Sequence, residues 1–126
     1  MHMGRRVVIL GAIFGMLGVG MGAFGAHALK EKLSPESLQI FETGVRYQFY
    51  HAFALLAVGI LYKDFSGKLL QWAGVLFICG TILFSGSLYV LTGGQSIKWI
   101  GAVTPFGGLC FIIGWLLLAA GVYKKN

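Results

Sequence analysis

Charge is what this 126-residue sequence lacks most. Asp, Glu, Lys and Arg together make up 11% of the residues, against about 25% in an ordinary soluble domain. Only four residues are acidic, whereas hydrophobic residues make up 57% of the chain. A water-soluble protein of this length needs far more polar surface. The composition therefore excludes an ordinary soluble domain and predicts an integral membrane protein that forms one domain over residues 1–126.

Cysteine is also scarce, and basic residues are not clustered. Cys79 and Cys110 lie within apolar stretches, without the CxxC spacing of a metal or redox motif, and are expected to be buried thiols. The net charge is +6, but the basic residues lie at the ends of apolar stretches and form no patch, so nucleic-acid binding is not expected. Their positions favour the anchoring of helices in an anionic membrane.

Charged residues are absent from four long stretches of the chain, at 7–29, 47–62, 69–97 and 99–123. A membrane-spanning helix needs about 20 apolar residues, and three of the stretches reach that length. The second is shorter, so its helix is expected to begin earlier, with the side chain of Arg46 extending to the interface. The sequence predicts four spans, at about 7–29, 44–62, 69–92 and 99–122. Pro105 is expected to kink the fourth span, because it removes a backbone hydrogen bond.

The four predicted spans put both termini on one side of the membrane. Six basic residues flank that side and four flank the other, so the positive-inside rule places both termini in the cytoplasm. The first outer connection contains Ser34-Pro35-Glu36, an order typical of a helix start. Apolar residues then recur at spacings of three and four over 38–45. This pattern predicts a short amphipathic interfacial helix that runs or bends into the second span.

Glycine is abundant, with 20 residues, and its spacing predicts how the helices pack. Glycines of the first span are alternately four and three residues apart, and small residues recur at intervals of seven in the third and fourth spans. Small residues let helices approach closely in lipid, and a seven-residue repeat favours a left-handed bundle. The predicted packing positions are Gly11, Gly15, Gly18, Gly22, Gly25, Gly80, Gly107 and Gly114. The first-span glycines could instead join two copies of the chain, so a homo-oligomer stays open.

Polar residues from all four predicted spans lie at a similar depth, in the outer half of the bundle. They are His27, Tyr47, Gln48, His51, Ser85, Tyr89 and Thr104. Polar groups within a membrane normally face the bundle interior or a wet cavity, so a common pocket that contains both histidines is predicted. Hydrogen bonds from helix to helix would also explain these residues.

No arrangement of residues in the sequence indicates catalysis. No acid lies within a span to orient a histidine, and Ser85 is not part of a nucleophile elbow. We therefore predict no catalytic residue, and no metal site either, because no carboxylate accompanies the histidines in the spans. Two histidines at one depth could still hold a haem, relay protons or bond a ligand.

Four ordered motifs resemble those of a known family. They are Gly22-Ala23-Phe24-Gly25-Ala26-His27, Thr43-Gly44 followed by Tyr47-Gln48 and His51, Leu83-Phe84-Ser85-Gly86-Ser87-Leu88-Tyr89, and Thr104-Pro105 with Gly107-Gly108. With these motifs the chain resembles the bacterial membrane family named domain of unknown function 423, whose eukaryotic relatives are called transmembrane protein 256. The resemblance implies a small multi-pass bundle in the plasma membrane, and it implies no reaction. Its motif positions coincide with the predicted polar cluster.

The function favoured by these predictions is non-enzymatic and needs no cofactor. An outer-leaflet polar pocket would bind a small amphipathic or lipid-like ligand, in a protein whose other partner is membrane lipid. One alternative is a proton-coupled transporter or a membrane redox carrier that uses His27 and His51. A redox carrier of this kind could hold a haem. A structural or assembly subunit is the other alternative.

Overall fold

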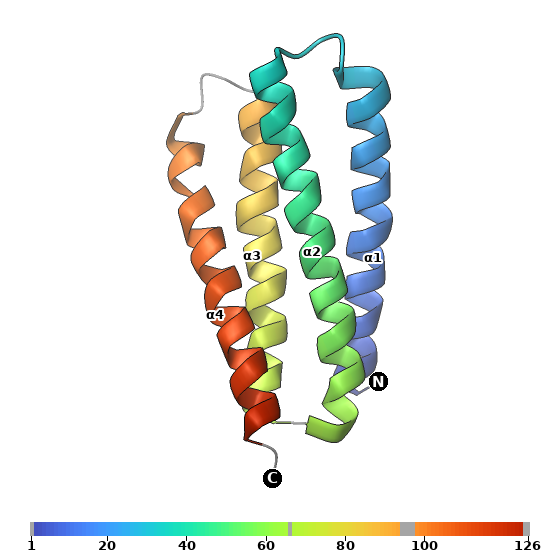
Figure 1. The fold of residues 1–126 in the computed structure, drawn as a ribbon, viewed down its shortest axis with the longest axis vertical. Helices are drawn as coiled ribbons and strands as arrows, with labels where there is room; N and C mark the ends of the chain where they lie inside the picture. The colour runs from blue at the N-terminus through green and yellow to red at the C-terminus, as the bar shows by residue number, and fades with distance from the viewer. Residues whose placement is uncertain (1, 66, 94–97, 125–126) are drawn as a thin grey trace.

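The computed structural model describes residues 2–65, 67–93 and 98–124, and every element within these ranges is helical. The α-helices are four in these ranges, and they run alternately up and down (Figure 1). The elements are α1 (Met3–Phe24), the π-helical turn η1 (Gly25–Leu29), α2 (Pro35–Phe65), α3 (Lys68–Gly93), the 3-10 turn η2 (Lys98–Ala102) and α4 (Thr104–Tyr123). The connection predicted between the third and fourth spans lies largely outside the described residues, as does Lys125.

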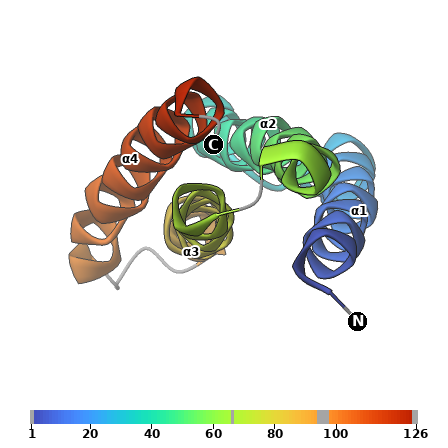
Figure 2. The ribbon, with the colours of Figure 1, turned by 90° about the horizontal axis from the view of Figure 1, so that it is seen from below.

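The four helices form an open, curved row. Packing is extensive between α1 and α2, between α2 and α3, and between α3 and α4, whereas α2 and α4 meet at few points. Seen from below, α1 and α4 lie at opposite ends of the row (Figure 2). Much of the surface of the two end helices is therefore left uncovered by protein.

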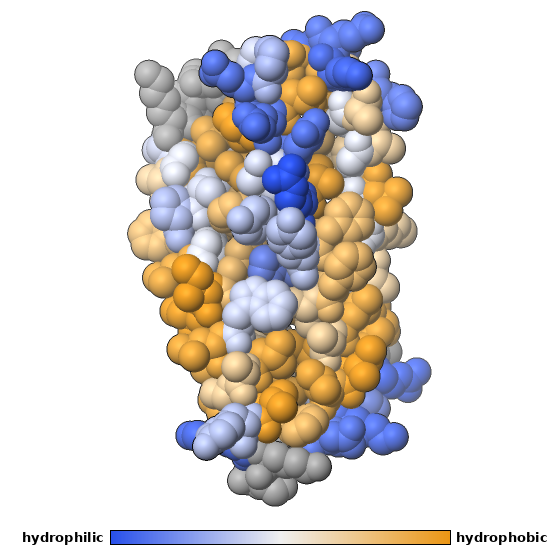
Figure 3. Space-filling model, viewed as in Figure 1, coloured by the Kyte–Doolittle hydropathy of each residue, from blue (hydrophilic) through white to orange (hydrophobic). Residues whose placement is uncertain are grey.

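The buried core lies mainly between α2 and α3, and large apolar side chains also cover the outside. Leu55, Leu70 and Phe77 are fully buried, but Ile112 of α4 is 68% exposed. An apolar band separates hydrophilic residues at the two ends of the molecule (Figure 3). Met3–Leu29, Lys68–Gly93 and Trp99–Tyr123 are long and apolar enough to cross a membrane. This surface is suited to contact with lipid tails.

Helix α2 begins earlier than the predicted second span. The backbone N–H of Ser37 donates to the Ser34 hydroxyl oxygen at 3.1 Å, which caps the helix as the sequence predicts. From Pro35 the helix continues without interruption to Phe65. The residues expected to form an interfacial helix that runs or bends into the second span are therefore the first turns of α2, which continues from them without a break.

Pro105 lies at the start of a helix and not within a continuous span. Residues Lys98–Ala102 form the 3-10 turn η2, and α4 begins at Thr104. Pro105 thus occupies the first turn of α4, where the backbone N–H groups have no partner within the helix and its missing N–H costs nothing. A kink at Pro105 would therefore fall at the junction of η2 and α4 and not within a continuous α-helix, and it stays a prediction.

Glycines in α1 differ in what covers them. A Cβ atom added to Gly11 would lie 2.9 Å from the carbonyl oxygen of Ala52 in α2, and one added to Gly18 would lie 3.0 Å from the Phe49 ring. A Cβ on Gly15 would meet no atom within 4 Å. Gly22 and Gly25 also face side chains of α2. The covered glycines therefore lie on the face of α1 toward α2, and Gly15 lies off that face.

Helices α3 and α4 also approach each other closely at glycines. A Cβ on Gly107 would lie 2.5 Å from the backbone nitrogen of Phe84, and one on Gly80 would collide with the ring of Phe111. A Cβ on Gly114 would lie 2.8 Å from the ring of Phe77. These glycines let aromatic side chains of each helix lie against the backbone of the other.

Candidate ligand-binding groove

His51 lies on α2 at the junction of three helices, and both of its ring nitrogens are hydrogen-bonded. Its Nδ1 atom lies 2.8 Å from the carbonyl oxygen of Tyr47. Because a carbonyl only accepts, Nδ1 carries the hydrogen and donates it. The other nitrogen, Nε2, accepts the indole N–H of Trp115 in α4 at 3.0 Å. The imidazole is therefore neutral, in one defined tautomer.

Aromatic rings surround this imidazole. The ring of Phe111 stacks on that of His51, with centroids 3.5 Å apart and planes 5° from parallel. The rings of Phe77 and Trp115 lie 5.5 Å and 5.7 Å from it, each tilted to its plane. Helices α2, α3 and α4 thus hold one polar ring in an otherwise apolar setting.

A groove of about 460 Å³ opens beside His51, between α2 and α4. Its lining is mostly aromatic and consists of Tyr47, Tyr50, His51, Phe84, Gly108, Phe111, Ile112 and Trp115. Figure 3 shows pale residues of intermediate hydropathy between α2 and α4, within the apolar surface. The groove therefore faces the same surroundings as the lipid-facing side chains.

Two tyrosines that line this groove have hydroxyl groups with no hydrogen-bond partner among the described residues. They are Tyr47 and Tyr50, whose rings meet edge to face with centroids 5.4 Å apart. A hydroxyl without a partner in hydrocarbon costs free energy, because no water is there to satisfy it. The groove thus combines apolar walls with two polar groups that a ligand could bond.

Gln48, Ser85 and Tyr89 belong to a different network, on another side of α2. The Gln48 side-chain amide donates to the carbonyl oxygen of Phe14 in α1 at 2.8 Å and accepts the Tyr89 hydroxyl at 2.6 Å. Ser85 donates to the carbonyl oxygen of Gly44 at 2.6 Å. These bonds tie α1, α2 and α3 together. The three side chains also line a smaller groove of about 240 Å³, where the polar groups named here are already paired.

Thr104 and His27 lie apart from both sets. The hydroxyl of Thr104 is 2.5 Å from that of Ser87, which joins the start of α4 to α3. His27 lies exposed in η1, lines neither groove, and its ring forms no hydrogen bond within the described part of the chain. Of the seven polar residues predicted to share a pocket, the structure places only Tyr47 and His51 in the groove between α2 and α4.

Several groove residues were missed by the sequence analysis, although the sequence contains a signal for them. Gly108, Phe111 and Trp115 are three and four residues apart and therefore share one face of α4. Trp115 lies in the middle of α4, whereas tryptophan in membrane helices is usually found near the interfaces. A tryptophan so placed needs a partner for its indole N–H, and a polar residue on another span is the natural candidate.

Metal ligation finds no support in the arrangement of side chains. Within the ranges that the structure describes, no three His, Cys, Asp or Glu side chains gather where they could hold a metal ion. Both nitrogens of His51 are already hydrogen-bonded. In this arrangement neither nitrogen is free to bind a haem iron.

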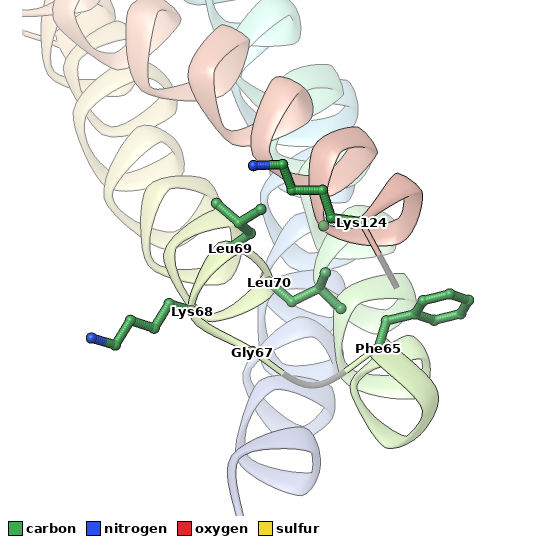
Figure 4. Close-up of a pocket in the computed structure, with 7 residues that line it drawn as sticks. Phe65, Gly67, Lys68, Leu69, Leu70 and Lys124 are labelled. Atoms are coloured by element: carbon green, nitrogen blue, oxygen red, sulfur yellow. The ribbon is translucent and has the colours of Figure 1, made fainter. Parts of the chain in front are cut away.

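A small cavity of about 160 Å³ lies at the opposite end of the molecule, between the start of α3 and the end of α4. Figure 4 shows Leu69 and Leu70 inside this corner and the side chain of Lys68 pointing away from it. Gly121 leaves the space open, because a Cβ there would collide with Leu70. Gly67, with φ of 156°, lies at the turn into α3. We interpret the cavity as a packing gap at a chain reversal.

The described part of the chain is all helical and includes three apolar helices of span length, which defines the class: this is a helical membrane protein. It belongs to the family described as protein of unknown function DUF423, whose model matches residues 21–108. The resemblance inferred from the four motifs is thereby confirmed.

Relatives are similar over almost their whole length. The UPF0382 membrane protein of Staphylococcus saprophyticus is 49% identical over 117 residues, which cover 93% of this chain and 96% of that protein. The UPF0382 membrane protein YwdK of Bacillus subtilis is 47% identical over 118 residues, covering 93% and 95%. One from Staphylococcus aureus is 47% identical over 120 residues, covering 95% and 97%. No solved structure matches the chain.

Proposed function

We propose that this protein is a non-enzymatic membrane protein whose groove between α2 and α4 binds an amphipathic, lipid-like ligand. The observation that carries the proposal is an aromatic groove lined by Tyr47 and Tyr50, whose hydroxyls have no hydrogen-bond partner among the described residues. Such a groove matches a molecule with an apolar body and a polar group that can donate or accept a hydrogen bond.

The size and walls of the groove define the ligand more closely. Its volume of about 460 Å³ falls within the usual range for small-molecule sites, about 300 to 1,000 Å³. It would hold one ring system or part of one acyl chain, not a whole phospholipid. The apolar body would lie against Phe111 and Ile112, and the polar group would bond the tyrosine hydroxyls.

His51 serves this site as a support in our proposal. Its hydrogen bond fixes the ring of Trp115, and its stacking contact fixes that of Phe111. Rings held in this way lose little conformational freedom when a ligand binds, which favours affinity. Since both of its nitrogens are occupied, His51 is better suited to shaping the groove than to carrying protons.

The proposal includes a membrane topology. We infer that α2 is a fourth span: it has 31 residues, which at about 1.5 Å per residue is about 46 Å, and its segment 47–62 has no charged residue. Figure 1 shows it beside the other helices over their whole height. The protein would then be a multi-pass protein of the plasma membrane with both termini in the cytoplasm, as the excess of basic residues there supports.

Removal of the two hydroxyls tests the groove without changing its shape. Protein carrying Tyr47→Phe and Tyr50→Phe together should co-purify with about tenfold less of the bound molecule, because each lost hydrogen bond contributes about 0.5 to 1.5 kcal/mol. Mass spectrometry of extracts from purified protein measures the bound molecules. Tyr123→Phe is the matched control, since Tyr123 is 91% exposed and lies outside the groove. Equal ligand content in all three proteins would contradict the proposal.

A second variant blocks the groove directly. A Cβ on Gly108 would have its nearest neighbours at 3.9 Å, in the Phe84 ring, so a side chain there enters open space. Gly108→Leu should therefore fold with unchanged thermal stability in detergent and lose the co-purifying molecule. A variant that folds and keeps its full ligand content would show that this groove is not the binding site.

A further inference from the structure

A second groove lies between the start of α1 and the end of α2, and shares no residue with the first. Its volume is about 420 Å³, and its lining consists of His2, Gly4, Arg5, Val8, Ile9, Gly59, Ile60 and Lys63. It exists because two glycines bring the backbones together: a Cβ on Gly4 would lie 2.9 Å from the carbonyl oxygen of Gly59. Val8 packs directly against Gly59 at this crossing, and the trough runs along the helix pair beside it.

The walls of this trough are apolar and its mouth is basic. Val8, Ile9 and Ile60 form the walls, and Ile60 is 67% exposed. Arg5 and Lys63 lie at the end of the trough where α1 begins and α2 finishes. Figure 3 shows hydrophilic residues gathered below the apolar band in this part of the molecule.

The two cations at the mouth have no acidic partner. No ion pair involving Arg5 or Lys63 forms within the described ranges, and Asp64, which follows Lys63 in the chain, does not line the trough. An apolar trough that ends at two cations without an acidic partner matches an acyl chain joined to an anionic headgroup, such as a phosphate. Basic pockets between membrane helices on the cytoplasmic side are typical sites for anionic headgroups.

We infer that this groove binds an anionic phospholipid. One acyl chain lies along Val8, Ile9 and Ile60, and the phosphate lies between Arg5 and Lys63. Charge complementarity selects the headgroup: a lipid with a net negative charge is favoured, whereas the quaternary ammonium of phosphatidylcholine is repelled by the same cations. The inference is independent of the ligand proposed for the groove between α2 and α4.

Native mass spectrometry of the full chain, purified in detergent with equal amounts of phosphatidylglycerol and phosphatidylcholine, tests this inference. Each cation near a membrane surface contributes about fivefold to the binding of an anionic lipid, so the pair gives about 30-fold. The wild type should retain phosphatidylglycerol selectively. Arg5→Gln with Lys63→Gln should lose about 30-fold of that binding, whereas the matched pair Lys30→Gln with Lys32→Gln, beyond the far end of α1, should not.

Other results would overturn the inference. If both double variants lose phosphatidylglycerol equally, overall charge and not this site causes the loss. If the wild type retains both lipids equally, the groove does not select an anionic lipid. If inorganic phosphate displaces more lipid than chloride does at equal ionic strength, the site binds free anions and not specifically a phospholipid. If the Arg5 and Lys63 variant does not fold, the wild type decides: phosphatidylglycerol must raise its melting temperature more than phosphatidylcholine does. The variants at Tyr47 and Tyr50 should keep phosphatidylglycerol, which separates this outcome from that of the proposed function.

Discussion

The imidazole of His51 donates to a carbonyl group of its own helix and accepts from Trp115 of another. A buried polar ring is tolerated in apolar surroundings when each of its polar atoms has a partner. Here the pairing also selects the tautomer and holds an indole ring at the wall of the groove. At the scale of single residues, the hydrogen bond between His51 and Trp115 therefore has two roles: it stabilises the fold, and it shapes the proposed site.

Trp115→Phe should lower the free energy of unfolding by about 0.6 to 1.7 kcal/mol, the range measured for hydrogen bonds between membrane helices. The reason is that the change leaves His51 Nε2 without a donor. Denaturant titration in detergent micelles measures the effect. Trp72→Phe is the control, because Trp72 is 56% exposed and its indole makes no hydrogen bond among the described residues. The hydrogen bond contributes nothing measurable if the two variants lose equal stability.

At the scale of helices, glycine spacing sets which contacts are close, but neighbouring glycines have different roles. A Cβ on Gly107 would meet the backbone of Phe84, whereas one on Gly108, the next residue, would point into the open groove. Gly86, in α3, faces no atom within 4 Å. Only the glycines that the backbone or a side chain of another helix covers are required for packing, and the sequence does not distinguish them.

Gly107→Ala should destabilise the protein by about 1 to 3 kcal/mol, because helices α3 and α4 must move apart to admit the methyl group. Gly86→Ala should be neutral or stabilising by up to about 1 kcal/mol, since alanine restricts the unfolded chain and meets nothing in the fold. Thermal melts of both variants in the same detergent measure the difference. Equal melting temperatures would show that α3 and α4 are not in backbone contact at Gly107.

The helical elements follow from the gaps between charged residues, whereas their boundaries and neighbours do not. Ser34, Pro35 and Glu36 predict the start of α2. No local signal indicates whether the helix bends after them or continues unbroken. The polar cluster was predicted chiefly from a shared depth, which does not determine the neighbouring helix that each side chain contacts. Gln48 and His51 are one turn apart on α2, yet they contact different helices: Gln48 bonds α1 and α3, whereas His51 bonds α4.

At the scale of the whole molecule, the open row of helices explains why the predicted single pocket is divided. In a closed bundle, polar residues at one depth would all face one interior. In this row, α2 has α1 on one side and α3 with α4 on the other, so its polar residues face separate grooves. Both proposed sites lie on the outside of the row, where lipid has direct access to them.

The proposed membrane topology rests on the charges at the two ends of the helices, and accessibility to a membrane-impermeant thiol reagent tests it. The end with both termini carries Arg5, Lys63, Lys68 and Lys124, so it should lie in the cytoplasm. In a background with both native cysteines changed to alanine, Glu36→Cys should be labelled on intact cells and Asp64→Cys should not. Both positions are exposed and lie at opposite ends of α2, so both should react once the membrane is permeabilised. Labelling of Asp64→Cys alone on intact cells would reverse the orientation, and labelling of both would mean that α2 does not cross the membrane.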